Sequence, residues 1–177
     1  MEKIDYNFDI VKLQKELSTL LGRVPLHFNQ LCLMHKENCN DPYYYGCGSL
    51  TYDGGYTTGK QTRRTIIHSE NEFYIFNKEL TNTYSHTVYT ELSKHYKLAR
   101  LRIMALDQKT CLSWHRDVDR RIHIPIATDE KCKFVLEDEV FFLPADGNAY
   151  IVDTRKFHTV FNGSGIVRTH LVASILE

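Results

Sequence analysis

Residues 121–127 read RIHIPIA, and they alternate isoleucine with residues of a different kind. In a β-strand, successive side chains point to opposite faces, so Ile122, Ile124 and Ile126 share one face. Arg121 and His123 share the other. The stretch therefore predicts a strand with an apolar core on one face and ionisable groups on the other.

Several more short apolar runs follow Lys97. They are LARLRIMAL (98–106), KFVLE (133–137), EVFFLP (139–144), NAYIVDT (148–154), HTVFN (158–162) and VRTHLVASIL (167–176). Asp-Gly, Asn-Gly and proline separate them. Short, closely spaced strands joined by hairpin-type turns are typical of a sandwich or barrel and not of a βαβ fold. We therefore expect residues 98–177 to form a jelly-roll core that carries the functional site.

The region before Lys97 shows helical periodicity in two segments, residues 9–21 and 82–97. The first ends at stop signals, Gly22 and then Pro25. Residues 24–64, rich in glycine and tyrosine, predict loop with short strands at most. We expect one domain, residues 1–177, of the α+β class. Its double-stranded β-helix (jelly-roll, cupin-like) core would be buttressed by the helices of a support region, residues 1–97.

The composition excludes several classes of protein. The chain has 177 residues, of which 42% are hydrophobic, enough for one domain with a sizeable core. The 22 basic residues equal the 22 acidic ones, so the charge indicates no nucleic-acid or membrane partner. GKQTRR at 59–64 is best interpreted as a solvated loop. With no long apolar span and no signal-peptide core, the chain is expected to be soluble and cytoplasmic.

The five cysteines, an odd number, fit reduced thiols in a cytosol better than a disulfide framework. Cys32, His35, Cys39 and Cys47 offer four zinc ligands in principle. Their spacing lacks the paired C-x2-C knuckles of structural zinc sites, so scattered thiols are the better interpretation.

A metal site is predicted by the stretch WHRDV at 114–118. His115 and Asp117, interpreted as one face of a strand segment, can direct a nitrogen and a carboxylate oxygen at one point. A histidine from a later strand would complete the two-histidine, one-carboxylate facial triad of Fe(II). His158, before an Asn-Gly turn, is the best placed. Asp119 has the same parity as Asp117, but the His-x-Asp spacing favours Asp117.

Arg168 and His170 share a face of their strand, as Arg121 and His123 do. Arg168 lies ten residues after the third predicted ligand and can bind a carboxylate through two hydrogen bonds. The alternatives stay open: His123 and His170 can be hydrogen-bonded structural residues, and Arg121 a surface ion-pair partner.

Together these motifs resemble the Fe(II)/2-oxoglutarate dioxygenases, in particular the aspartyl/asparaginyl β-hydroxylase-like branch. The resemblance covers about residues 100–177. It is carried by H-x-D at 115–117, R-x-H-x-P at 121–125, Asp-Gly at 146–147, and His158 and Arg168 with the T-H-L-V that follows. Enzymes of this group have a jelly-roll core and oxidise a substrate C–H bond while they decarboxylate 2-oxoglutarate.

The resemblance implies a role for each matching residue. His115, Asp117 and His158 would hold Fe(II), and Arg168 would bind the distal carboxylate of 2-oxoglutarate. Arg121 and His123 would lie near its iron-bound end.

Asp117 departs from the animal aspartyl hydroxylases of this branch, which lack the carboxylate ligand, and matches bacterial free-proline hydroxylases of the wider group. The substrate therefore stays open between an amino acid, a peptidyl residue and a small metabolite, with O2 as co-reactant. Trp114 is interpreted as a packing residue beside the site. The tyrosines of the glycine-rich region form either a substrate lid or plain surface; they are Tyr43, Tyr44, Tyr45, Tyr52 and Tyr56.

Two other functions remain. A cupin-like metalloenzyme that does not use 2-oxoglutarate can have the same barrel and triad, but gives Arg168 no purpose. A non-catalytic jelly-roll that binds a ligand or peptide is disfavoured because buried ionisable clusters are costly unless they bind something charged.

Overall fold

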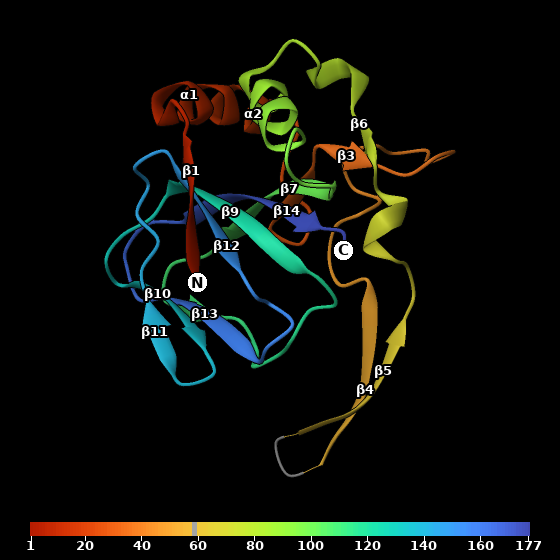
Figure 1. The fold of residues 1–177 in the computed structure, drawn as a ribbon, viewed down its shortest axis with the longest axis vertical. Coiled ribbons are helices and arrows are strands. Elements are labelled where there is room, and N and C mark those ends of the chain that lie inside the picture. The colour runs from red at the N-terminus through yellow and green to blue at the C-terminus, as the bar shows by residue number, and fades with distance from the viewer. Residues whose placement is uncertain (58–59) are drawn as a thin grey trace.

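Two antiparallel sheets face each other in the computed structural model, which describes the backbone of residues 1–57 and 60–177 and the side chains outside 52–64 (Figure 1). The larger sheet has six strands, in the spatial order β1 (Glu2–Asn7), β12 (Asn148–Val152), β9 (Arg120–Ala127), β14 (Arg168–Ile175), β7 (Leu98–Leu106) and β2 (Gln30–Cys32). The smaller has four, in the order β11 (Glu139–Phe141), β10 (Cys132–Leu136), β13 (His158–Asn162) and β8 (Thr110–Cys111). The core is a jelly roll, as expected.

Two smaller pairs of strands accompany the jelly roll. β3 (Met34–His35) pairs with β6 (Ile75–Phe76), and β4 (Thr51–Thr57) pairs with β5 (Lys60–Ile66). The β4–β5 pair projects away from the rest of the molecule (Figure 1). Two short 3₁₀ helices, η1 (Glu70–Glu72) and η2 (Lys78–Leu80), lie on either side of β6 in the sequence.

The two faces of the six-stranded sheet have different composition. Its outer face carries the isoleucines of β9 and the alternate apolar residues of neighbouring strands, among them Leu101 and Leu171, in one buried cluster. Its inner face looks toward the four-stranded sheet and shares a second apolar cluster with it, which includes Leu106, Phe134 and Val160. Arg121 and His123 lie on that inner side because they alternate with the isoleucines.

Helices α1 (Ile10–Leu21) and α2 (Tyr84–Leu92) lie side by side at one end of the molecule (Figure 1). α1 begins where the Asp9 carboxylate accepts a hydrogen bond from the Lys12 amide at 3.0 Å. Buried residues of both helices, among them Leu13 and Val88, belong to the apolar cluster of the sheet's outer face. Among the described residues, no helix combines the length and apolar character needed to cross a membrane.

Local differences from the expected elements have simple causes. The second helix ends at Leu92, five residues before the predicted end. Beyond it the amides of Lys94 and His95 donate to carbonyls three residues back, in place of the four-residue spacing of an α-helix, so the chain continues as a turn. The stretch 114–118 is not a strand; His115 makes a single antiparallel bridge to His158. The strand predicted at 139–144 stops at Phe141.

The region predicted to be helix and loop also supplies strands. β1 and β2 join the six-stranded sheet, so that sheet extends beyond residues 98–177. β1 exposes most of its side chains and buries only Ile4, which leaves no alternating apolar pattern to detect. The segment that follows β1 lies against the turn at Gly147, where the Phe8 amide donates to the Gly147 carbonyl at 2.8 Å. Gly147 has φ of 84°, and a Cβ would lie 2.2 Å from the Phe8 carbonyl oxygen.

Candidate metal centre

Three side chains converge at the mouth of the jelly roll. His115, Asp117 and His158 each offer a ligand atom, and these atoms all lie within 4.8 Å of one another. The imidazole rings of the two histidines have centroids 4.4 Å apart. In the part of the chain that the structure describes, this is the one group of three or more potential metal ligands.

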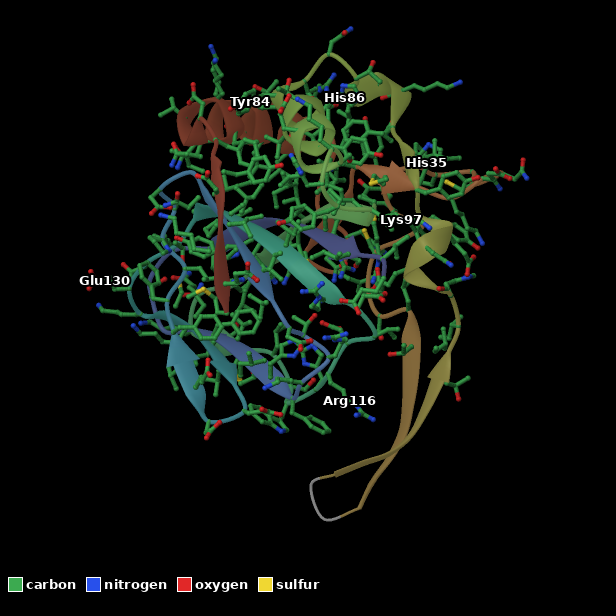
Figure 2. All side chains as sticks on the ribbon, in the orientation of Figure 1. His35, Tyr84, His86, Lys97, Arg116 and Glu130 are labelled. Carbon is green, nitrogen blue, oxygen red and sulfur yellow. The ribbon has the colours of Figure 1, made fainter. Side chains whose placement is uncertain are left out.

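The backbone fixes this convergence. The His115 amide donates to the His158 carbonyl at 3.0 Å, and the His158 amide donates back to the His115 carbonyl at 2.7 Å. The Asp117 amide donates to the Thr154 carbonyl at 2.7 Å. The predicted ligands therefore meet although residues 114–118 form no regular strand. Arg116, between the two ligand positions, points outward from the jelly roll (Figure 2) and lies over the Phe157 ring, 5.6 Å from its centre.

Both histidines present the same nitrogen toward the site. His115 Nδ1 donates to the Ser113 carbonyl at 2.6 Å, and His158 Nδ1 donates to the Lys156 carbonyl at 3.0 Å. Because a carbonyl oxygen only accepts, Nδ1 carries the proton in each neutral ring and Nε2 keeps its lone pair. Burial also lowers the pKa of His158 to about 4, against the opposing effect of Asp117. His158 is therefore neutral near pH 7 and able to bind a metal ion.

Asp117, not Asp119, is the carboxylate that meets the histidines. Its Oδ2 atom lies 3.5 Å from His158 Nε2 and 2.8 Å from Arg121 Nη1. This oxygen has no directed hydrogen bond from any described side chain, so the contact with Arg121 is a charge pair. The sequence resemblance implied that Arg121 lies near the cosubstrate; the structure places its guanidinium against a predicted metal ligand.

A second polar group lies on the inner face of the sheet, around Arg168. This side chain is buried, and its Nη2 donates to His170 Nδ1 at 3.1 Å. No carboxylate within the described residues forms an ion pair with it. Burial lowers the Arg168 pKa to about 10, so the guanidinium stays charged at neutral pH.

His123 is adjacent to this group, with its ring centroid 5.7 Å from that of His170. Burial, and secondly Arg168, hold the pKa of both histidines well below the ordinary value. Both are therefore neutral. Neither nitrogen of His123 has a hydrogen-bond partner among the described residues, and neither does His170 Nε2. Buried polar atoms of this kind are uncommon in folded proteins and indicate a site for a ligand or for water.

An open cavity of about 450 Å³ adjoins the triad. The described residues that line it include His115 and Asp117. Two arginines and one acid that no sequence motif had indicated line it as well: Arg100, Arg102 and Glu70. Arg100 and Arg102 occur two residues apart in LARLRIMAL, as Arg121 and His123 do in RIHIPIA. The rule that ionisable residues at alternate positions of a strand share a face could therefore have identified them. Glu70 carries no such signal because its partners are distant in sequence.

Glu70 ties the support region to the six-stranded sheet. Arg100 Nη1 donates to Glu70 Oε1 at 2.8 Å, and Ser174 Oγ donates to Oε2 at 2.9 Å. Burial raises the pKa of the Glu70 carboxyl, but the nearby arginines outweigh that effect and hold it at about 2. Arg100 also donates to the carbonyls of Gly46 and Gly48 and so fixes one wall of the cavity.

The tyrosines expected as lid or surface pack against the protein where they are described. Tyr43 donates to Glu79, Tyr44 donates to the Pro25 carbonyl, and Tyr45 packs against His68. None of these three lines the cavity. The side chains of Tyr52 and Tyr56 lie outside the described residues, as do those of residues 59–64, although the backbone from residue 60 onward belongs to β5.

Trp114 stacks on Phe157 with ring centroids 6.3 Å apart, beside the predicted metal ligands. The cysteines are free thiols. Cys32 and Cys47 lie with their sulfur atoms 3.8 Å apart, but His35 and Cys39 do not converge with them. The described residues therefore give no support to the four-ligand zinc alternative.

Comparison with known proteins agrees with this geometry. The family model described as aspartyl/asparaginyl beta-hydroxylase matches residues 73–177, more than half of the chain. A search of the curated proteins finds no match.

Solved structures are similar to this chain at low sequence identity, and the first of them supports the fold. An oxidoreductase of the 2OG-Fe(II) oxygenase family from Burkholderia pseudomallei has a TM-score of 0.50 at 15% identity, covering 92% of this chain and 76% of that one. AviO1 from Streptomyces viridochromogenes Tue57 has a TM-score of 0.49 at 12% identity, covering 99% and 88%. A cupin domain from Bordetella pertussis Tohama I has a TM-score of 0.40 at 15% identity, covering 46% and 84%.

Proposed function

Since this chain belongs to the aspartyl/asparaginyl β-hydroxylase family, we propose that it is an Fe(II)- and 2-oxoglutarate-dependent oxygenase. Its reaction would hydroxylate a C–H bond of an amino acid, a peptidyl residue or a small metabolite. One observation carries the proposal: a two-histidine, one-carboxylate cluster lies in the same jelly roll as the buried Arg168, which has no carboxylate partner among the described residues.

The residues at the triad fit Fe(II). Two imidazoles and one carboxylate are the ligand set of non-haem Fe(II) oxygenases, which keep open positions on the metal. His115 and His158 each have Nε2 available because a backbone carbonyl holds the other nitrogen. Asp117 Oδ2 is buried and accepts no directed hydrogen bond from the part of the chain that the structure describes. When bound, Fe(II) supplies the one-electron and O2 chemistry that side chains cannot provide.

Arg121 has a positioning role in this arrangement. Its Nη1 lies 2.8 Å from Asp117 Oδ2 and forms a charge pair with that carboxylate. Its contact with Glu70 at 3.5 Å anchors it from the other side. The guanidinium therefore holds the Asp117 carboxylate in place from the wall of the cavity.

The group around Arg168 fits the distal carboxylate of 2-oxoglutarate. A buried guanidinium can form two charge-assisted hydrogen bonds to a carboxylate, and these are strong where water is excluded. His123 and His170 are neutral, so they add polar contacts without a competing charge. His123 offers two unpartnered nitrogens in the same region.

One aromatic side chain, Phe134, contacts residues of both groups. It stacks on the His158 ring with centroids 5.4 Å apart and meets the His123 ring edge-on at 5.6 Å. An apolar ring at this position limits the access of solvent to the site. A cupin-like enzyme without 2-oxoglutarate would leave the buried charge of Arg168 without a partner.

The experiment is turnover of 2-oxoglutarate by purified protein with Fe(II) and O2, measured as succinate release against a panel of free amino acids and peptides. We expect succinate formation that needs both Fe(II) and O2 and stops on chelation. Zinc should occupy the site without supporting turnover, because Zn²⁺ has no redox chemistry. Turnover that persists without iron, or no succinate in any arm, would refute the proposal.

A further inference from the structure

A second buried arginine on the inner face of the six-stranded sheet also lacks an acidic partner among the described residues. Arg102 in β7 is 2% exposed. Within the described residues it makes no ion pair; its Nη1 donates to Gln30 Oε1 at 2.9 Å, a neutral acceptor. Its Nε atom is buried with no hydrogen-bond partner among the described residues. A buried guanidinium with an unpartnered nitrogen indicates that an anion is missing from its surroundings.

The other arginines of the cavity show the contrast. Arg100 is paired with Glu70 at 2.8 Å, and Arg121 is paired with Asp117 at 2.8 Å. Among the charged side chains described in the cavity wall, the charges within each of these two pairs cancel, and the positive charge of Arg102 is left without a counterpart. Burial, and then Arg100 and Arg121, lower the Arg102 pKa to about 9, so it is still protonated at neutral pH. A bound anion would offset this repulsion.

The register of the strands separates Arg102 from Arg168. Arg102 pairs with Val172 of β14, which pairs on its other side with His123 of β9. Directly opposed residues share a face, so Arg102 and His123 both face the interior. Arg168 pairs with Leu106, and it lies four positions before Val172 along β14, or roughly 13 Å. The two arginines thus serve different parts of the interior, and each can hold its own anion.

The cavity beside Arg102 is lined in part by apolar side chains. Leu50, Met104, Leu112 and Val118 line it together with His115 and Asp117. At about 450 Å³ it has the size of a small-molecule pocket. It therefore offers one cationic anchor, an apolar wall, and the triad at one side. Gln30 is fixed at the anchor because its Oε1 also accepts from the Gly48 amide at 3.1 Å.

We propose that Arg102 binds the carboxylate of the substrate, which is a small free carboxylic acid with an apolar body, the apolar amino acids included. This rests on the proposed oxygenase function and narrows its substrate. An internal peptidyl residue with an apolar side chain has no free carboxylate and is excluded. In this arrangement Arg168 binds the cosubstrate, and Arg102 binds the substrate in the cavity that His115 and Asp117 also line.

The test compares Arg102→Met and Arg102→Lys with wild type and with Arg155→Met, a surface control. Arg155 pairs only with Asp153 and Glu177 among the described residues, at a half-exposed position. The probes are the free apolar amino acids and their carboxamides. The measurements are substrate-stimulated succinate release and, separately, anaerobic 2-oxoglutarate affinity. Gln30 Oε1 keeps its bond from Gly48 in the Met variant, and the Lys variant retains the charge if the Met variant fails to fold.

In wild type, at least one acid should stimulate turnover, and its carboxamide should need a concentration about 10-fold or more higher. Arg102→Met should raise the half-saturating acid concentration about 10- to 150-fold, with 2-oxoglutarate affinity unchanged. Arg102→Lys should fall between, and Arg155→Met should match wild type.

Equal response to acid and amide, no stimulation by any acid, or an unchanged Arg102→Met variant would overturn the proposal. So would a matching loss of 2-oxoglutarate affinity in Arg102→Met, because Arg102 would then belong to the cosubstrate. Failure of wild type to bind 2-oxoglutarate with metal would instead refute the oxygenase function.

Discussion

The two faces of the six-stranded sheet use the same strands for different purposes. On the outer face, Ile122, Ile124 and Leu171 lie in one apolar cluster that extends to the helices. On the inner face, alternate residues of the same strands include Arg121 and His123, each with a ring or guanidinium nitrogen that has no hydrogen-bond partner among the described residues. The alternation of a strand therefore separates stability from chemistry residue by residue. Substitutions one position apart should have different effects.

The largest expected effect comes from the metal ligands on the inner side. Asp117→Ala should abolish Fe(II)-dependent turnover while the protein remains folded, because Asp117 contributes nothing to either apolar cluster. Asp119→Ala is the matched control and should keep metal binding, since Asp119 does not converge with the histidines. Metal content and circular dichroism of both variants measure the two effects. Retained turnover in Asp117→Ala would break the triad assignment.

The outer face should respond in the opposite sense. Leu171→Ala removes a side chain that is 1% exposed, and truncations of this kind cost about 2–5 kcal/mol of unfolding free energy. Val11→Ala, on the exposed face of α1, should cost almost nothing. Denaturant unfolding measures both. At denaturant concentrations below its unfolding transition, Leu171→Ala should retain wild-type affinity for 2-oxoglutarate. A large change in that affinity would show that the two faces of the sheet are not independent.

Three positions before Leu171, on the inner face, Arg168→Lys should affect binding and not folding. The lysine keeps the charge but loses the planar two-point geometry, so 2-oxoglutarate affinity should fall about 10- to 150-fold. Metal affinity should hardly change, because other residues hold the metal. Arg155→Lys is the surface control. Equal 2-oxoglutarate affinity in Arg168→Lys and wild type would favour the cupin-like alternative.

The smallest expected effect is on the pH dependence of the free energy of unfolding, through three buried histidines of the interior. His123, His158 and His170 have lowered pKa values, so they stay neutral in the folded state while the unfolded chain takes up protons near pH 6.5. The metal-free protein should therefore lose stability as the pH falls from 6.5 toward 4. Each histidine accounts for about 1 kcal/mol between pH 6.5 and 5.5. His158→Gln should reduce that loss by about this amount; an unchanged slope would contradict the burial of His158.

The strands of the jelly roll were predictable because their signal is local. β7 and β13 have the expected bounds, and β9, β10, β12 and β14 lie within two residues of them. Alternation of apolar side chains depends only on the strand itself and its buried face. β1 was missed because only Ile4 is buried, and β4 and β5 because their sequences, TYDGGYT and KQTRRTI, have no apolar alternation.

The site was predictable only in part, for a related reason. His115, Asp117 and His158 were expected to meet, and the structure brings their ligand atoms within 4.8 Å. Glu70 could not be found, since its partners Arg100 and Arg121 are 30 and 51 residues away. The contact of Arg121 with Asp117 depends on how residues 114–121 bend, which the sequence pattern does not determine.

An oxygenase of the proposed kind binds 2-oxoglutarate in its interior, next to a metal ion held by the triad. Anaerobic calorimetric titration of 2-oxoglutarate into wild-type protein, with and without Fe(II), measures this binding. We expect saturable 1:1 binding that is tight with Fe(II), weak without it, and lost with the metal in Asp117→Ala. Binding of the same strength with and without Fe(II), or no binding in either case, would contradict this expectation.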